Sequence, residues 1–135
     1  MKTVTTNEIL KIEKLKKYFH IGKDKQGPIY VRAVDGVDLN IKYGETLGLV
    51  GESGSGKSTI AYNVVGMYRP TSGQILFKGE NIGVEASRRP LSIKKEIQIV
   101  FQDPGSSLNP RQTVEQILGL PFRIHTQIRS EFLFL

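Results

Sequence analysis

The sequence predicts an α/β fold within one domain, in which short strands surround a glycine-rich loop that opens a helix. Two of the observations behind this prediction are an apolar run at Thr46–Val50, typical of a buried parallel strand, and a glycine- and serine-rich stretch directly after it. The third is helical spacing of the following residues, namely Ile60, Ala61, Val64, Val65 and Tyr68. The 135 residues are a usual size for one domain, and 39% hydrophobic content is enough for a core.

The loop itself reads Gly51-Glu52-Ser53-Gly54-Ser55-Gly56-Lys57-Ser58-Thr59, which matches the phosphate-binding pattern G-x-x-x-x-G-K-[ST]. Such a loop turns sharply and presents backbone N–H groups to phosphates, and glycine permits the positive φ angles that this requires. Lys57 can reach the β- and γ-phosphates, and the Ser58 hydroxyl can ligate Mg²⁺. A glycine-rich surface loop is the alternative, but the strand before the loop and the helix after it favour a nucleotide site.

Before the loop, alternating apolar residues predict strands at Glu8–Leu15, Val31–Val34 and Val37–Ile41. Between the first two, Phe19–Pro28 contains glycine, lysine and proline, which predicts a loop. Lys42–Glu45 is expected to turn into the strand before the phosphate loop.

After the helix, Pro70–Gly73 predicts a turn, and Gln74–Lys78 and Glu96–Phe101 predict strands. Gly79–Pro90 and Gln102–Arg111 are expected to be irregular. Thr113 followed three residues later by Gln116 has the form of a capping box, so a helix is expected from there to about Leu118.

Composition limits the class of protein. The chain has no cysteine, which excludes disulfides and suits a cytosolic protein, and it has no apolar run of membrane-spanning length and no signal-peptide segment in Met1–Lys17. A net charge of +6 allows a basic patch for nucleic acid or anionic lipid. A solvated lysine face is the favoured interpretation, because no RNP-like or helix-turn-helix signal is present, and no nucleic-acid partner is expected.

Four landmarks resemble the ATP-binding subunits of ABC transporters. These are the approach Val34–Ile41 before Gly44-Glu45, the turn Pro70–Gly73 with its strand, the segment Val100-Phe101-Gln102, and an aromatic residue after the first strand. Phe101-Gln102-Asp103-Pro104 with Ser107–Arg111 narrows the resemblance to subunits of oligopeptide and dipeptide importers. Importers of nickel or other small solutes share parts of this signature.

The resemblance implies ATP and Mg²⁺ as cofactors and adds three residues to the site. Phe19, or Tyr18 as the second choice, would stack on adenine, and Gln102 would lie near Mg²⁺ or the attacking water. It also implies two membrane permease subunits and a sister ATP-binding subunit as partners. ATPase domains dimerise in that family, and the protein would be peripheral, on the cytoplasmic side of the cell membrane.

The 135 residues contain no Leu-Ser-Gly-Gly-Gln signature, no Walker B acidic strand and no switch histidine. We therefore expect one partial ATPase domain over residues 1–135, with a nucleotide-binding core at about 8–111 and the start of a helical subdomain and a divergent tail at about 112–135. A truncated or frameshifted reading frame would produce such an end.

Because these motifs are absent, no ATP hydrolysis is expected from this chain alone, although the parent family is an ATPase. The alternatives are a nucleotide-binding remnant without hydrolysis and another P-loop NTPase. A GTPase is disfavoured because the only Asp-x-x-Gly, Asp24 to Gly27, precedes the loop.

Overall fold

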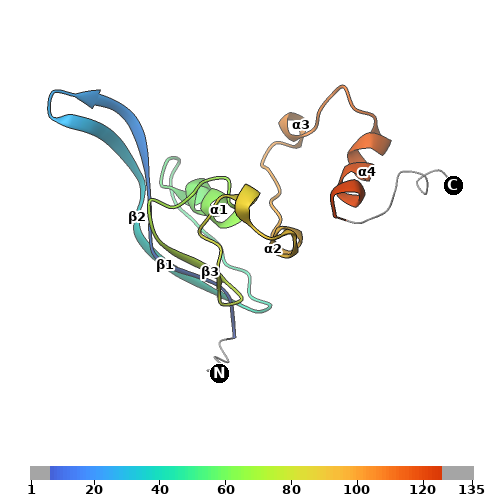
Figure 1. Ribbon diagram of the computed structural model, residues 1–135, viewed down its shortest axis with the longest axis horizontal. Coiled ribbons are helices and arrows are strands. Elements are labelled where there is room, and N and C mark those ends of the chain that lie inside the picture. The colour runs from blue at the N-terminus through green and yellow to red at the C-terminus, as the bar shows by residue number, and fades with distance from the viewer. Residues whose placement is uncertain (1–6, 126–135) are drawn as a thin grey trace. The chain divides into compact units, whose positions relative to one another are not determined.

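The computed structural model describes residues 7–125 of the chain (Figure 1). They divide into two compact units, with the boundary between Arg89 and Pro90. The first unit holds an antiparallel sheet, the glycine-rich loop and the helix that follows the loop. The second unit is helical in its regular parts. The expected α/β class is therefore confirmed.

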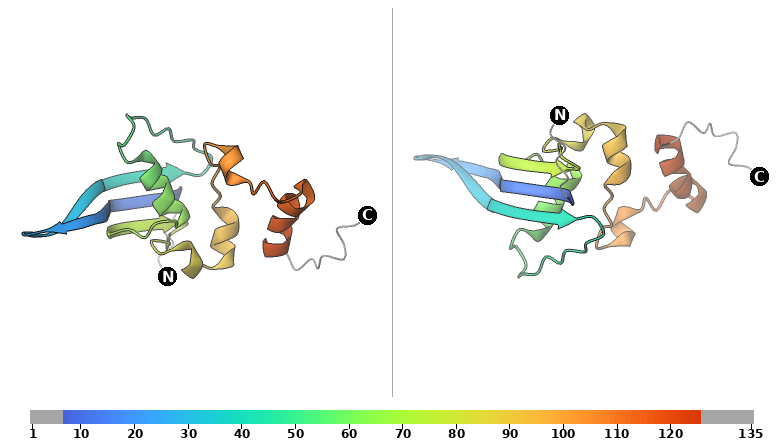
Figure 2. Two further views of the ribbon diagram at one scale, coloured as in Figure 1. Left: turned by 90° about the horizontal axis from the view of Figure 1, so that it is seen from above. Right: turned by 90° about the horizontal axis from the view of Figure 1, so that it is seen from below.

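The sheet of the first unit has four antiparallel strands in the order β2-β1-β3-β4. Their bounds are β1 (Glu8–Asp24), β2 (Gly27–Lys42), β3 (Ser72–Phe77) and β4 (Glu80–Asn81). Helix α1 (Lys57–Val65) lies along one face of this sheet (Figure 2). A short 3-10 helix (Ala86–Arg88) follows later in the same unit.

Strands β1 and β2 form one long hairpin, so the loop expected at Phe19–Pro28 is wrong. Pairing continues to Asp24 opposite Gly27, and the Asp24 carboxylate accepts the amides of Gln26 and Gly27 at 2.7 and 3.0 Å. Pro28 is tolerated because β2 is an edge strand, where the missing N–H breaks no ladder. The turn therefore comprises only Lys25 and Gln26, and not the ten residues Phe19–Pro28 that were expected to form a loop.

The core of the first unit lies between the sheet and α1. Buried apolar side chains of β1, β2 and β3 form it, together with Ile82 directly after β4; the strand residues are Leu10, Ile12, Leu15, Val34, Ile75 and Phe77. Their strand periodicity confirms the strands expected at Glu8–Leu15 and Gln74–Lys78. Burial of these side chains supplies the main stabilisation of the sheet.

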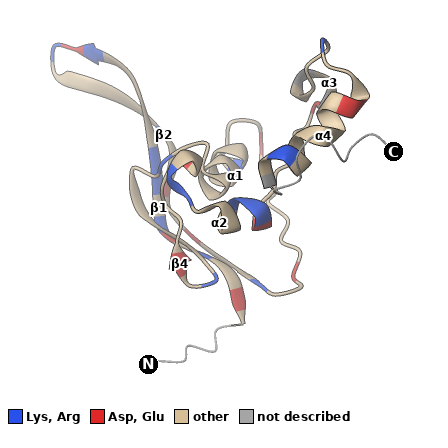
Figure 3. Ribbon diagram, turned by 45° about the vertical axis from the view of Figure 1, so that its right-hand side comes forward, with Lys and Arg blue, Asp and Glu red and all other residues tan. Residues whose placement is uncertain are grey.

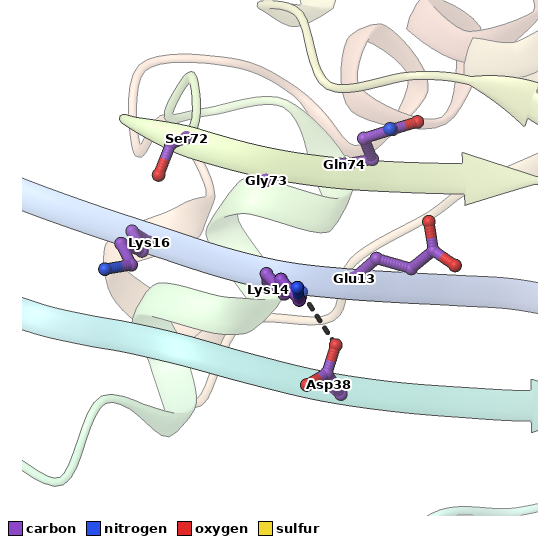
Figure 4. A pocket seen from close by; sticks show the side chains of 7 residues that line it. All are labelled: Glu13, Lys14, Lys16, Asp38, Ser72, Gly73 and Gln74. Carbon is purple, nitrogen blue, oxygen red and sulfur yellow. Dashed lines mark hydrogen bonds between the residues drawn. The ribbon is translucent and has the colours of Figure 1, made fainter.

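A β-bulge interrupts β1 at Lys14, whose φ is 47°. The Lys14 amide donates a hydrogen bond to Asp38 Oδ1 on β2 at 2.8 Å. On the other side, Gly73 (φ 88°) leaves no room for a side chain, because a Cβ there would overlap the carbonyls of Glu13 and Lys14. Figure 4 shows these residues around an open pocket of about 570 Å³ on the sheet face opposite α1.

No strand among the described residues pairs with Thr46–Val50, which was expected as a buried parallel strand, or with Glu96–Phe101, which was expected as a strand. Val50 is 98% exposed and Val100 is 95% exposed. A parallel strand forms only when a neighbour supplies the ladder, and residues 7–125 supply none to either segment. Neither segment forms the expected strand, because the described residues contain no neighbouring strand that pairs with it.

The second unit contains α2 (Leu91–Glu96), α3 (Pro104–Ser107) and α4 (Val114–His125). At the start of α4, the Gln116 amide donates to Thr113 Oγ1 at 3.2 Å, and the Thr113 amide donates to Gln116 Oε1 at 3.0 Å. The capping box is thus confirmed. The helix runs past Leu118 and contains Pro121, although an interior proline removes one backbone hydrogen bond and crowds the carbonyl four residues earlier. The expected divergent tail lies mostly outside the described residues.

Lysine and arginine residues are spread over β1, β2, the hairpin end and α2, with acidic residues among them (Figure 3). Two ion pairs lie on β1: Lys11 with Glu13 at 2.7 Å, and Lys16 with Asp35 of β2 at 3.2 Å. All four side chains remain substantially exposed, so these pairs are weak contributors to stability.

Candidate phosphate-binding loop

The glycines of the loop adopt the backbone conformations that the sequence predicted for them. Gly54 and Gly56 have φ angles of 82° and 92°, in the left-handed region that favours glycine. Gly56 also packs directly on β2, since a Cβ there would overlap the carbonyl oxygen of Ala33. The loop is therefore seated on the sheet at its last glycine, immediately before α1.

The Lys57 ammonium is held at the centre of the loop. Its Nζ donates to the carbonyl oxygens of Gly51 at 2.7 Å and Glu52 at 2.6 Å, and to Ser55 Oγ at 3.1 Å. A Cβ added to Gly51 would lie 2.8 Å from Ser55 Oγ and 4.0 Å from Nζ, so it would enter the same small space. The loop thus forms a cradle around the Lys57 ammonium, and the space for that ammonium depends on the absence of a side chain at Gly51.

The start of α1 is chemically prepared for an anion. Gly56 at its N-cap offers no side-chain acceptor, and the first turn contains no acidic residue. The first backbone bond of the helix runs from the Ile60 amide to the Gly56 carbonyl at 2.9 Å, which leaves the amides of Lys57, Ser58 and Thr59 at an uncapped amino end. The macrodipole adds positive potential at this end. These residues fit a phosphate chain.

Phe19, the first candidate for adenine stacking, is half-buried on β1. Its ring meets the ring of Tyr68 edge to face at 5.1 Å, and Lys17 Nζ lies 4.9 Å from its centroid. Tyr68 in turn contacts Tyr62 of α1 at 5.6 Å. Phe19 therefore joins an aromatic cluster next to the last turns of α1, and its role toward a base stays a prediction.

Tyr18, the second candidate, is engaged by polar partners. Its hydroxyl donates to the carboxylate of Asp35, and the guanidinium of Arg32 lies 5.5 Å from its ring centroid. The hydrogen bond from Tyr18, followed by that from Lys16, lowers the pKa of Asp35. Tyr18 thus belongs to a charged surface network on β1 and β2.

Gln102 is exposed and lies in the second unit, between α2 and α3. Two residues that follow it, Asp103 and Asn109, have local structural roles in this loop. Asp103 caps α3 by accepting the Gly105 amide at 2.9 Å, and Asn109 accepts the Arg111 amide at 3.0 Å. The loop is therefore built from local side-chain caps, and the part of Gln102 at a metal stays a prediction.

One residue that matters to this helix was missed by sequence reasoning. Arg89 is only 5% exposed and binds the carboxyl end of α1. Nothing in the sequence distinguishes it from Arg88 beside it, because its role depends on a contact with residues about 25 positions earlier. Asn63, fully buried on α1, was also missed, because its burial depends on how α1 packs in the fold.

Seated on a sheet and opening a helix, the glycine loop with Lys57 defines a P-loop nucleotide-binding protein of the α/β class. The sequence profile of the family described as "ABC transporter" matches residues 34–133. The chain therefore belongs to the ABC transporter family, as the sequence landmarks implied.

Individual relatives agree with this assignment. The chain is 47% identical to the oligopeptide transport ATP-binding protein AppF of Bacillus subtilis over 93% of its length and 39% of that protein. It is 49% identical to the oligopeptide transport ATP-binding protein OppF of Lactococcus lactis over 87% of its length and 37% of that protein. The chain thus spans about two fifths of the length of these relatives.

Two solved structures share the fold. Both are dimeric structures of the ABC transporter cassette MJ0796, with TM-scores of 0.69 and 0.68, and one of them is bound to ADP and Pi. Each is 24% identical to this chain and covers 91% of it and 50% of the MJ0796 chain. At this identity the similarity establishes the fold alone.

Within residues 7–125, no helix is both long and apolar enough to cross a bilayer. The same residues contain no group of three His, Asp or Glu side chains that could hold a metal ion by themselves.

Proposed function

We propose that this chain is the nucleotide-binding part of an ABC importer subunit that couples ATP binding and hydrolysis to uptake of oligopeptides or dipeptides. The observation that carries the proposal is the cradle around Lys57 Nζ at the uncapped amino end of α1. The names of AppF and OppF support the peptide class, because both are oligopeptide transport ATP-binding proteins.

In the proposed site the loop Gly51–Thr59 holds the phosphates of ATP. Lys57 leaves the carbonyls of Gly51 and Glu52 and pairs with phosphate oxygens instead, which exchanges neutral acceptors for charged ones. The amides of the first turn bind the same anion, and Ser58 is placed in this turn to ligate Mg²⁺. Phe19, or else Tyr18, stacks on adenine, and Gln102 approaches the metal or the attacking water.

The remaining parts of the proposal concern the whole transporter. The nucleotide-binding core covers about residues 8–111, and the helical subdomain begins at about residue 112. The partners are permease subunits and a sister ATP-binding subunit, which would place the protein peripherally on the cytoplasmic side of the membrane. Because residues 1–135 lack the signature and Walker B motifs, ATP binding is proposed for this chain and ATP turnover for a polypeptide that also contains them.

The decisive experiment is a titration of the 135-residue chain with Mg-ATP, followed by calorimetry, against two lysine variants. Lys57→Ala should abolish binding, since it removes the ammonium at the centre of the loop. Lys25→Ala, at the exposed hairpin turn, is the matched control and should bind like the unmodified chain. Equal binding of Mg-ATP by both variants would contradict the proposed site.

The alternative of a nucleotide-binding remnant is tested in cells. Uptake of a labelled oligopeptide should fall when Lys57→Ala is introduced into the gene that encodes this chain. If Mg-ATP binds but peptide uptake does not depend on Lys57, the remnant is the correct assignment.

A further inference from the structure

Arg89 is a buried cation at the carboxyl end of α1. Its side chain is 5% exposed and its guanidinium donates to three carbonyl oxygens. The acceptors are Val64 O at 2.6 Å, Asn63 O at 3.1 Å and Val84 O at 3.1 Å. Two of these carbonyls belong to the last turn of α1, so Arg89 ties the helix to the segment that ends the first unit.

The contact has a clear physical basis. The last four carbonyls of a helix lack intrahelical partners, and the negative end of the macrodipole favours a cation there. The fork of the guanidinium reaches several carbonyls at once, which a lysine ammonium does less well. Burial lowers the pKa of Arg89, but an arginine side chain keeps its charge at neutral pH.

Gly66 leaves room for the Arg89 guanidinium at the end of α1. It ends α1 with a φ of 84°, and its carbonyl accepts the Ala86 amide at 2.9 Å. A Cβ on Gly66 would lie 2.8 Å from both Arg89 Cζ and the Ala86 amide nitrogen. The close approach of Arg89 to the helix therefore depends on the absence of a side chain at Gly66.

The two ends of α1 carry complementary chemistry. The helix has 9 residues and is therefore about 13 Å long, with Arg89 bound to its last turn and the phosphate loop at its first turn. A helix of two and a half turns transmits a displacement of one end to the other, because its backbone hydrogen bonds make it stiff. The sheet side of the loop is held by Gly56 on Ala33, whereas Arg89 holds the opposite end of the helix.

We propose that Arg89 is a positioning residue for nucleotide binding: seated against Gly66, it anchors the carboxyl end of α1 and thereby orients the phosphate loop at the amino end. This inference rests on the proposed function of the loop. The three carbonyls that accept from Arg89 lie outside the loop Gly51–Thr59, so the proposed effect passes through α1.

The test compares Arg89→Gln with Arg88→Gln in the 135-residue chain. Both variants lose one positive charge, but Arg88 is an exposed side chain that pairs with Glu85 at 3.6 Å on the surface. Two measurements are made on each variant: affinity for Mg-ATP by calorimetry, and amide hydrogen exchange of the nucleotide-free chain. The exchange of β1 and β3 reports whether the sheet itself remains folded.

We expect Arg89→Gln to weaken Mg-ATP binding about tenfold. Exchange should accelerate in the first turn of α1, read at the Ile60 amide that is bonded to the Gly56 carbonyl, as well as in the last turn, while β1 and β3 stay protected. Gly66→Ala should have the same effect with Arg89 still present, and Arg89→Lys should restore part of the affinity. Arg88→Gln should change neither measurement.

Acceleration confined to the last turn of α1, or an unchanged affinity of Arg89→Gln, would overturn the inference. Failure of the proposed function looks different, because the unmodified chain would then bind no Mg-ATP. In that case the exchange of the first turn still decides whether Arg89 positions the loop. If Arg89→Gln loses protection throughout the sheet, the milder variant Arg89→Lys is used as the test instead. The inference is then contradicted if amide exchange in the first turn of α1 is the same in Arg89→Lys as in the unmodified chain.

Discussion

The carbonyl oxygen of Ala33 on β2 occupies the position that a side chain on Gly56 would need. This single contact sets the phosphate loop on the sheet, because Gly56 is also the N-cap of α1 and has a φ of 92°. A helix whose first turn binds an anion must start at a defined place, and the backbone of β2 defines it.

Gly56→Ala should disrupt the loop by both strain and overlap. The left-handed conformation costs roughly 1–2 kcal/mol for a residue with a side chain, and the overlap with Ala33 adds to this. Urea unfolding should show a lower midpoint, and calorimetry should show no Mg-ATP binding. Gly79→Ala is the matched control, because Gly79 has a φ of 82° with nothing within 4 Å, so it should lose only the conformational part and keep binding.

Asn63→Leu should stabilise the chain. Asn63 is fully buried on α1, its Nδ2 donates to Thr59 O at 2.7 Å, and its Oδ1 has no hydrogen-bond partner. An unsatisfied buried acceptor costs about 1–3 kcal/mol, and an apolar side chain of similar size removes that cost. The urea midpoint should rise; a fall would show that the amide is satisfied in solution. Asn81→Leu, where the side chain is exposed and already accepts the Gly83 amide, should give no gain.

Asp35 should make stability depend on pH in the acid range. The hydrogen bond from Tyr18, then that from Lys16, lowers the pKa of Asp35 in the folded state. A carboxyl with a lowered folded pKa contributes stability above its unfolded pKa of about 4, and that contribution disappears as the pH falls through the folded pKa. Asp35→Asn should flatten this part of the stability curve, measured by urea unfolding between pH 2 and 6. An unchanged curve would contradict the assignment.

Thr113→Ala should loosen the start of α4. The change removes the oxygen that accepts the Gln116 amide, and loss of such a cap costs about 1 kcal/mol of helix stability. Amide exchange over Val114–Ile117 should accelerate severalfold. Thr113→Ser keeps the hydroxyl and serves as the control, and equal exchange in the two variants would show that the cap is not formed.

Local signals were enough for several elements. The phosphate loop, the β3 strand and the capping box of α4 each depend on residues adjacent in the chain, so pattern and spacing predicted them correctly. The prediction for the hairpin end was wrong. Gly22 and Pro28 indicate a loop, whereas the pairing of two long strands overrides that tendency. Val50 and Val100 carry a strand pattern, but a pattern does not supply the neighbouring strand.

The sequence by itself determined that the chain carries a nucleotide loop of the ABC transporter family, because glycine, lysine and serine at fixed spacing are dictated by the chemistry of phosphate binding. Only the tertiary structure decided what holds that loop in place. Ala33 meets Gly56 from a different strand, and Arg89 reaches the end of α1 from more than twenty residues away. Contacts of this kind arise from packing between distant segments, so periodicity and spacing along the chain do not predict them.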